Sequence, residues 1–427
     1  MKGDFMSDKQ IFAAVEISDH EVRLVVGEFF NTRFNIIKVE RIPCYGLSFN
    51  KVINADAITD ALKKAAQNTR KMLGADIKKV LLAMPSYRMK RYSVRSTVDV
   101  QGIDGVITIE DVRNAMRKAE SVSIGKEYAL IQTVCVKYIV NGISTRRVPI
   151  GERCSQLSVD IDLLCADRKL SFDLVNCVEK SGMQVLDIFP DVYAVAKEAA
   201  LFEQAVRKQV IILKVERDST TLGLLRKGRL TTAALMPAGL GTLAEPVVSQ
   251  YGIKTDTAVE LLKYSARLNQ KVCSANPVHI WSDHGHTRTI NEQQLVDCVR
   301  DNLDGWLDAI DKTCKPILQA GETAVIITGE GGETQGLAEL VQERLGVETK
   351  CYIPETLGGR NAGLTACLGL FYAYQDKLPI TGYINDSLDM DAFVKAVSYR
   401  DKKKSNSDTK EDTLTSKLKD LFLEGKK

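Results

Sequence analysis

IITGEGGETQGL, residues Ile326 to Leu337, joins an apolar run to a glycine-rich stretch. The apolar run, Thr323 to Ile327, predicts a buried strand. Gly329, Gly331 and Gly336 follow it, and glycine lets a backbone turn sharply or pass close to another group. Such turns are common, so this segment by itself indicates only a strand that ends in a tight connection.

Upstream of this segment the chain contains two groups of three short strands, each of which predicts a meander. The groups lie at 11–15, 22–28 and 34–39, and at 209–214, 220–226 and 229–235. The first group is followed by an amphipathic helix, Ala55 to Gly74, which glycine closes, and by a buried strand, Lys79 to Met84.

Residues 89–166 interrupt this alternation and have the pattern of a small α+β insertion, with strands near 91–100, 130–140 and 156–164. Thr108, with Asp111 three residues later, has the spacing of a capping box and predicts the start of a helix. A helix at 171–181 and a strand at 185–189 resume the alternation, and helices dominate 240–318, with a strand near 277–281. The whole pattern predicts a two-lobed α/β protein whose halves each carry an insertion.

The composition of the 427 residues limits the functions open to the chain. Its net charge of +3 is too small to indicate a nucleic acid as partner. Its ten cysteines lack CxxC spacing and are expected to be reduced thiols in a cytosolic protein, with no metal site. His284 and His286 lie in a polar stretch, Ser282 to Thr289, that predicts a surface loop. No run approaches the roughly 18 apolar residues of a spanning helix, so any membrane contact is expected from the side.

Four segments together resemble the actin, Hsp70 and sugar-kinase superfamily. Residues 326–337 resemble its adenosine-side motif, in which glycines let the backbone pass close to a nucleotide. The other three resemble the first phosphate hairpin, the second phosphate hairpin and the late connecting helix: 12–28 (FAAVEISDHEVRLVVGE), 210–228 (VIILKVERDSTTLGLLRKG) and 360–369 (RNAGLTACLG).

Within this superfamily the chain resembles FtsA, an actin-like cell-division protein of bacteria. The insertion at 89–166 has the place of the FtsA insertion, between the first sheet and the return helix. Three segments look like those of the family: 106–119 (VITIEDVRNAMRKA), 137–151 (KYIVNGISTRRVPIG) and 172–187 (FDLVNCVEKSGMQVLD). The resemblance implies a two-lobed actin-like fold with a small α+β insertion in the first half and a C-terminal amphipathic helix.

The same resemblance implies how the chain divides. The expected parts are a first half (8–88 and 167–203), the inserted subdomain (89–166), a second half (204–240 and 321–376), a helical subdomain (241–320), a linker (377–412) and a membrane-targeting helix (413–427).

The phosphate-binding turns are where the sequence departs from the family pattern. The family carries Asp-Ile-Gly-Thr-like and Asp-Ile-Gly-Gly-Gly-Thr-Thr-like turns, whose glycines expose backbone N–H groups to phosphate. Here the turns read EISDHE (16–21) and KVERDST (214–220), and Glu330 replaces a glycine on the adenosine side. The positions that match the family site are Ser18, Asp19, Glu216, Arg217, Asp218, Gly329, Gly331 and Gly336.

Carboxylates would then lie where the phosphates bind, from Asp19, Glu21, Glu216 and Asp218. Two like charges about 4 Å apart repel by roughly 4 kcal/mol at an effective dielectric constant near 20. We therefore expect a degenerate site that binds ATP and Mg²⁺ weakly or not at all, and no cofactor. The alternative is a rearranged loop that still binds ATP. We assign no catalytic residue and expect no ATP hydrolysis.

The C-terminal residues have the pattern of a linker followed by an interfacial helix. Residues 400–412 (RDKKKSNSDTKED) predict a disordered linker. In residues 413–427 (TLTSKLKDLFLEGKK) four apolar side chains share one helical face and lysines flank them, whereas Leu423 lies off that face. These membrane-binding candidates are Leu414, Leu418, Leu421, Phe422, Lys417 and Lys419. The pattern alone also fits a helix docked on its own protein, and the FtsA resemblance favours an anionic membrane surface.

Partners are implied by the resemblance alone. In FtsA-like proteins the helical subdomain receives the C-terminal peptide of FtsZ, and Arg288 and Arg300 match arginine positions there. A guanidinium suits an acidic peptide because it offers several fixed donors to carboxylates. Self-association as an actin-like polymer and contacts of 89–166 with later division proteins are also implied, at the cytoplasmic face of the membrane.

Two other functions stay open at this point. An ATP-dependent phosphotransferase of the sugar-kinase branch would need intact phosphate loops, which the lost glycines argue against. A pilus-assembly platform protein of the PilM type is also actin-like, with a similar insertion. The amphipathic C-terminal pattern favours the FtsA-like function, a tether between FtsZ filaments and the cytoplasmic membrane.

Overall fold

The first lobe is built on a five-stranded sheet in the order β11-β6-β1-β2-β3. The structure is a computed structural model and describes residues 9–30, 33–283, 285–381, 386–390, 392–393 and 395. The sheet strands are β1 (Lys9–Ile17), β2 (Glu21–Phe30), β3 (Arg33–Pro43), β6 (Lys79–Met84) and β11 (Gln184–Pro190). The first three form an antiparallel meander, and β6 and β11 join in parallel.

Helices and a short hairpin surround this sheet. They are α1 (Ala55–Leu73), α3 (Arg168–Lys180), α4 (Asp191–Glu198), β4 (Leu47–Ser48) and β5 (Lys51–Val52). The short helix α5 (Leu201–Gln204) follows α4 and packs against the second lobe. The Asn54 side chain accepts the Ala57 N–H at the start of α1, and Gly74 ends the helix in the left-handed conformation, as its sequence predicts.

The second lobe repeats the same order of strands, β14-β13-β12-β17-β18. These strands are β12 (Gln209–Val215), β13 (Thr220–Arg226), β14 (Arg229–Met236), β17 (Thr323–Thr328) and β18 (Thr349–Cys351). The glycine-rich segment after β17 forms η2 (Glu330–Glu333) and then α9 (Leu337–Leu345). The duplicated topology is that of a two-lobed actin-like fold.

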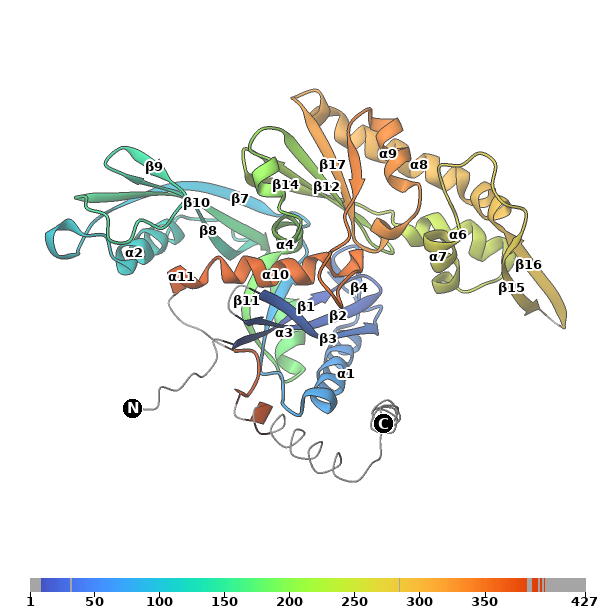
Figure 1. Cartoon of the computed structure of the whole chain (residues 1–427), viewed down its shortest axis with the longest axis horizontal. Coiled ribbons are helices and arrows are strands. Elements are labelled where there is room, and N and C mark those ends of the chain that lie inside the picture. Colours follow the sequence, from blue (N-terminus) through green and yellow to red (C-terminus); the bar gives the residue numbers. More distant parts are fainter. Residues whose placement is uncertain are drawn as a thin grey trace, which may run out of the picture.

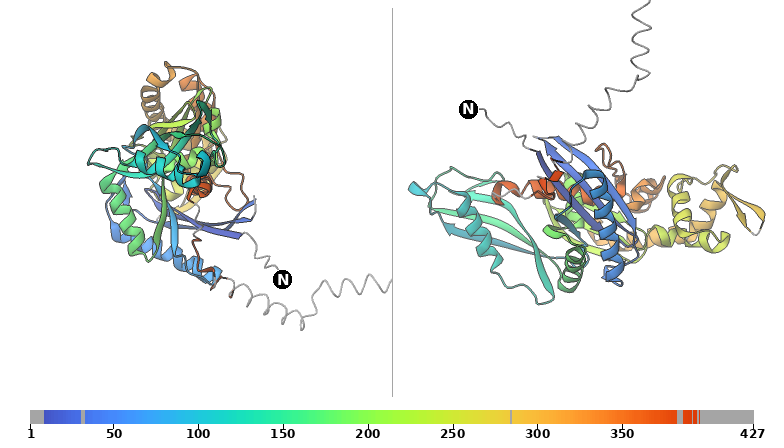
Figure 2. Two further views of the ribbon diagram at one scale, coloured as in Figure 1. Left: turned by 90° about the vertical axis from the view of Figure 1, so that its left-hand side faces the viewer. Right: turned by 90° about the horizontal axis from the view of Figure 1, so that it is seen from below.

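Each lobe carries an inserted unit, and the two units lie at opposite ends of the molecule (Figures 1 and 2). The unit in the first lobe is a four-stranded sheet, β7-β10-β8-β9, with one α-helix. Its elements are β7 (Lys90–Asp99), η1 (Ile103–Gly105), α2 (Ile109–Glu120), β8 (Tyr128–Val140), β9 (Ile143–Thr145) and β10 (Gln156–Asp167). Thr108 and Asp111 form the capping box that their spacing predicts.

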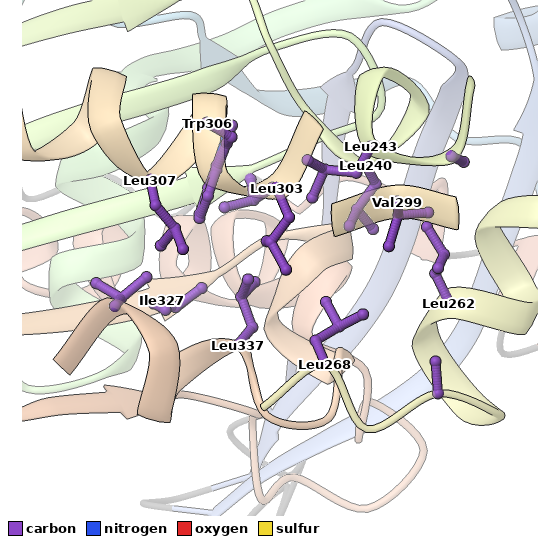
Figure 3. Packing of buried hydrophobic residues seen from close by; sticks show 14 of the residues in the cluster. Leu240, Leu243, Leu262, Leu268, Val299, Leu303, Trp306, Leu307, Ile327 and Leu337 are labelled. Carbon is purple, nitrogen blue, oxygen red and sulfur yellow. The ribbon is translucent and has the colours of Figure 1, made fainter. Parts of the chain in front are cut away.

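The unit in the second lobe contains three helices and a hairpin: α6 (Leu240–Tyr251), α7 (Thr255–Tyr264), β15 (Pro277–Asp283), β16 (His286–Asn291) and α8 (Glu292–Leu318). Figure 3 shows how α6, α7 and α8 pack on the second lobe, with Leu243, Leu303 and Leu337 converging. Trp306 of α8 is buried there, and its indole N–H donates to the Thr220 hydroxyl at 3.2 Å. This bond connects the helical unit to the start of β13.

The two lobes share a hydrophobic core that α4 and α10 (Thr365–Gln375) cross. Phe12 of β1, Ile212 of β12 and Phe371 of α10 belong to this core. Gly369 allows α10 to approach α4 closely, because a Cβ at this position would overlap the carbonyl group of Ala194. Two short helical turns flank α10, namely η3 (Ala362–Leu364) and α11 (Leu378–Thr381).

Beyond α11 the chain returns to the first sheet, and residues 386–388 form what we call the C-terminal strap. Ser387 is fully buried, its N–H donates to the Ile11 carbonyl at 2.9 Å, and its hydroxyl accepts the Ala13 N–H at 2.8 Å. The Ser387 carbonyl accepts the Lys78 N–H at 2.7 Å. The strap therefore bonds both to β1 and to Lys78 and Lys79, where β6 begins.

The structure differs from three predictions. The polar stretch 282–289 is not all loop, because β16 begins at His286 and pairs with β15. The late connecting helix does not cover 360–369 but starts at Thr365, since η3 precedes it. The linker cannot begin at 377, because α11 and the strap pack on the fold there. The membrane-binding candidates in 413–427 lie outside the described residues.

Candidate functional site

Two tight turns, one from each lobe, meet at the junction between the lobes. In the first turn the Ser18 N–H donates to the Glu21 carbonyl, and in the second the Glu216 N–H donates to the Ser219 carbonyl, both at 2.9 Å. Asp19 and Glu216 are buried in this junction. The structure thus brings together the predicted residues of the phosphate hairpins.

The carboxylate of Asp19 lies against the backbone of the second turn. Its Oδ2 accepts the Asp218 N–H at 2.7 Å, and its Oδ1 accepts the Arg217 N–H at 3.3 Å. The Ser219 hydroxyl is 3.4 Å from Oδ2. Successive N–H groups in a turn form a concavity that binds anions. We call these three donors the anion cradle. Burial raises the pKa of the Asp19 carboxyl, but hydrogen bonds and the charge of His20 bring that pKa below its ordinary value.

Arg23 of β2 crosses from the first lobe to the second. Its guanidinium is completely buried and donates to both oxygens of Glu216, at 3.0 and 2.6 Å. It also donates to Glu16 at 3.0 Å and to Glu21 at 2.6 Å. Burial opposes the charge of Arg23, yet these carboxylates raise its pKa well above the ordinary value. Such two-pronged contacts between arginine and carboxylate are among the stronger hydrogen bonds in proteins.

Lys214 of β12 crosses in the opposite direction. Its Nζ lies 2.5 Å from a Glu16 oxygen and 2.8 Å from Asp191 Oδ2, both in the first lobe. Asp191 begins α4, and its other oxygen accepts the Ser86 N–H at 3.0 Å. All of these groups are buried. We call the set of Glu16, Arg23, Asp191, Lys214 and Glu216 the inter-lobe charge cluster.

The repulsion expected from the carboxylates is offset by these cations. Glu21, for example, accepts hydrogen bonds from both Arg23 and Arg41. Burial would raise the pKa of Glu21, but the two arginines hold that pKa at about 2. Asp19, Glu21 and Glu216 thus each accept hydrogen bonds from protein donors, whereas burial and the charge of Asp19 raise the pKa of Asp218.

The adenosine side is closed by a second set of contacts. Gly329 and Gly336 adopt φ angles of 78° and 82°, which favour glycine. Arg217 donates to both oxygens of Glu330, at 3.0 and 2.8 Å, so the residue that replaces a family glycine pairs with the second turn. The Leu268 N–H donates to the carbonyl next to Gly336, that of Gln335, at 3.0 Å. Gly331 lies against Val215 of β12.

These residues do not fit the phosphates of a nucleotide. The cavity between the turns measures about 20 Å³, which is room for one water molecule. Carboxylates line it, and the cations that could meet a phosphate already contact Glu16, Asp191 and Glu216. Asp19, His20 and Glu216 also bring three possible metal-ligand atoms within 4.8 Å, but both carboxylates already accept hydrogen bonds from protein donors. We assign no metal to them.

His20 gives this region a dependence on pH. Its Nδ1 lies 3.0 Å from Asp19 Oδ1, and its Nε2 lies 3.6 Å from carboxylate oxygens of Glu21 and Glu330. Burial lowers the pKa of His20, but the hydrogen bond to Asp19 and the charge of Glu330 outweigh it, so the pKa is raised. A raised pKa means that stabilisation by the imidazolium is complete below the unfolded-state pKa and is lost as pH rises through the folded-state pKa.

We therefore expect the free energy of unfolding to fall as pH rises above about 6.5, by roughly 1.5–3 kcal/mol, the value of a charged hydrogen bond. Urea denaturation of the wild type and of His20→Gln between pH 6 and 9 measures this loss. The variant should show a flatter profile. Parallel profiles for the two proteins would contradict a charged His20.

The predicted partner residues lie far out on the helical unit and are exposed. Arg288 of β16 stands opposite Trp281 of β15 and lies 3.5 Å from Asp283. Arg300 of α8 pairs with Asp297 at 2.9 Å. The two arginines belong to one unit but pair with different carboxylates.

Sequence reasoning missed Arg23, Asp191 and the anion cradle. A signal for Arg23 was present, because a charged residue within the apolar strand segment VRLVV (22–26) indicates a buried ion pair. Asp191 carried no comparable signal.

Comparisons with known proteins show what the chain is similar to. The family described as "SHS2 domain inserted in FTSA" matches residues 87–165. Cell division protein FtsA of Bacillus subtilis (strain 168) is 22% identical over 374 residues, 86% of this chain and 83% of that protein. FtsA of Enterococcus hirae is 23% identical over 377 residues, with the same coverage. The chain is thus similar to FtsA over most of its length, at low identity. The similarity supports a role in cell division.

Solved structures agree on the fold. The PilM–PilN type IV pilus biogenesis complex aligns with a TM-score of 0.56 and 14% identity, over 84% of this chain and 97% of that one. MreB5 of Spiroplasma citri bound to ADP aligns with a TM-score of 0.50 and 12% identity, over 88% and 99%. The predicted actin-like fold with its inserted subdomain is therefore confirmed. Within the described part of the chain, no helix is long and apolar enough to cross a bilayer.

Proposed function

We propose that this FtsA relative is an adaptor that tethers FtsZ filaments of the division ring to the cytoplasmic face of the membrane, and that it works without ATP hydrolysis. The observation that carries the proposal is the combination of an FtsA-type fold with the amphipathic pattern of residues 413–427. The residues between the two turns, which do not fit phosphates, support the weak or absent nucleotide binding that we propose.

The membrane contact would be made by one face of residues 413–427. Burying the four apolar side chains of that face contributes about 1.5–3 kcal/mol each before the cost of ordering a short helix. One copy would bind marginally, so self-association into an actin-like polymer, which multiplies the anchors, would strengthen the contact. Lysines beside the apolar face favour an anionic surface.

The FtsZ contact would lie on the helical unit. Exposed Arg288 and Arg300 offer guanidinium donors to an acidic C-terminal peptide. Trp281, which stands opposite Arg288, packs edge-on against Tyr251 of α6 and adds an aromatic surface beside that arginine. The inserted subdomain at 89–166 would serve contacts between subunits or with later division proteins.

The test is sedimentation of the full chain with vesicles that contain phosphatidylglycerol. We expect the wild type to bind, and a variant that ends at Asp412 to lose binding by about tenfold or more, since the apolar face supplies most of the gain. Leu418→Glu with Leu421→Glu should lose binding equally. Leu423→Glu, off the apolar face, is the matched control and should stay within about threefold. Equal binding of wild type and truncated variant would refute the tether.

The same vesicles test the partner. A labelled FtsZ C-terminal peptide should be recruited by the wild type without ATP, and Arg288→Glu with Arg300→Glu should weaken recruitment by about tenfold, as expected for two reversed charges. Arg95→Glu, which reverses an exposed arginine of the inserted subdomain, is the control. If the peptide binds the double variant as well as the wild type, these arginines are not the contact.

A further inference from the structure

We infer that the chain carries its own substitute for a bound nucleotide: the Asp19 carboxylate fills the anion cradle of the second lobe, and the inter-lobe charge cluster holds the two lobes together. This goes beyond the tether and concerns only the junction between lobes. It would hold whether or not the chain binds membranes or FtsZ.

The anion half of the substitute comes from the first lobe. Asp19 is 6% exposed, and its two oxygens take the N–H groups of Arg217 and Asp218 at 3.3 and 2.7 Å. Backbone donors of this kind bind phosphate oxygens in other proteins. A phosphate that entered here would have to displace a buried, hydrogen-bonded side chain. The cradle is therefore a site for an anion that the protein itself supplies.

The cation half consists of two side chains that cross between the lobes in opposite directions. Arg23 of β2 contacts both oxygens of Glu216 at the second turn, 193 residues away in sequence. Lys214 of β12 contacts Glu16 of β1 and Asp191 of α4. Because both cations are buried and already paired, the lobes are bridged by ion pairs of the protein where a metal-bound nucleotide would otherwise join them.

Contacts on the adenosine side support the same inference. Arg217, whose N–H group serves the cradle, also binds Glu330 through two hydrogen bonds and contacts Asp256 of α7 at 2.6 Å. One residue thus links the cradle, the glycine-rich turn and the helical unit. Closure of the lobes is therefore set by the sequence and not by nucleotide concentration.

The experiment is thermal unfolding of the full chain in added ligand. A ligand that binds the folded state raises the midpoint by mass action. We expect millimolar Mg·ATP or inorganic phosphate to move the wild-type midpoint by less than about 1 °C, and titration calorimetry to show no ATP binding. A rise of more than about 3 °C, or a micromolar ATP affinity, would overturn the inference.

The anion cradle is tested by removing the Asp19 carboxylate that fills it. Asp19→Gly should melt several degrees below the wild type and should recover about half of the loss in 50 mM phosphate compared with sodium chloride of equal ionic strength. Asp19→Asn keeps the cradle filled and should show no recovery in phosphate. If Asp19→Gly melts like the wild type, or gains nothing from phosphate, the cradle is not an anion site. If it does not fold, wild-type calorimetry decides. Vesicle binding has a separate readout, so failure of the tether is recognised independently.

Discussion

Replacing Gly369 with alanine is expected to lower the free energy of unfolding by about 3 kcal/mol or more. The added Cβ would overlap the carbonyl of Ala194 and lie 3.0 Å from its Cα, and these are backbone atoms of α4 that cannot rotate away. Because α4 and α10 cross the core shared by both lobes, their separation would disturb both sheets. Guanidinium denaturation, followed by circular dichroism, measures the loss.

Gly305→Ala is the matched control for this substitution. Gly305 also lies within a helix, α8, but a Cβ there would meet no atom within 4 Å. Alanine favours helix over glycine by up to about 1 kcal/mol, so this variant should equal or exceed the wild type in stability. Similar losses for the two variants would show that the close approach of α10 to α4 is not what Gly369 provides.

Lys214→Met is expected to cost about 3–5 kcal/mol of folding free energy, the usual effect of removing one partner from a buried ion pair. The substitution leaves the Asp191 carboxylate buried without its cation, and leaves Glu16 paired with Arg23 alone. Adding Asp191→Asn should recover part of the loss, because it removes the uncompensated charge. The midpoint of urea denaturation measures both effects.

Lys208→Met is the matched control, because it removes the lysine of an exposed ion pair. Lys208 pairs with Glu348 at 3.1 Å, and the Glu348 carboxylate is half exposed. Exposed pairs contribute about 0–1 kcal/mol, so this variant should stay close to the wild type. If both lysine variants lose the same small amount, the Lys214 ion pairs do not stabilise the junction between the lobes.

Much of the fold could be predicted because its signals are local. Strand periodicity placed the meanders, glycine marked the end of α1 at Gly74, and the spacing of Thr108 and Asp111 gave the start of α2. The errors also have local causes. His286 to Thr289 are polar because they are all exposed, so this part of β16 lacks the alternation that reveals half-buried strands.

The sequence predicted where the candidate site lies, but not which of its side chains pair with one another. Motif order placed Asp19 and Glu216 at one junction, and the structure agrees. What decides their chemistry is pairing between residues that are far apart in sequence, as in Arg23 with Glu216. Neither hydrophobic periodicity nor motif spacing in the sequence predicts such a long-range pair. For this reason a count of carboxylates predicted repulsion, whereas in the folded chain Asp19, Glu21 and Glu216 accept hydrogen bonds from protein donors.

The C-terminal strap also has a mechanical consequence. Ser387 and Leu388 are buried, Ser387 against β1 and the start of β6 and Leu388 against Ile77, downstream of every core helix. A force that pulls on the residues beyond 395 therefore first meets Met390 and Phe393, which pack on the core of the first lobe. It then loads the hydrogen bonds of the strap to Ile11, Ala13 and Lys78 before it reaches α10. The first sheet, rather than the junction between the lobes, is the mechanical anchor of the C-terminal end.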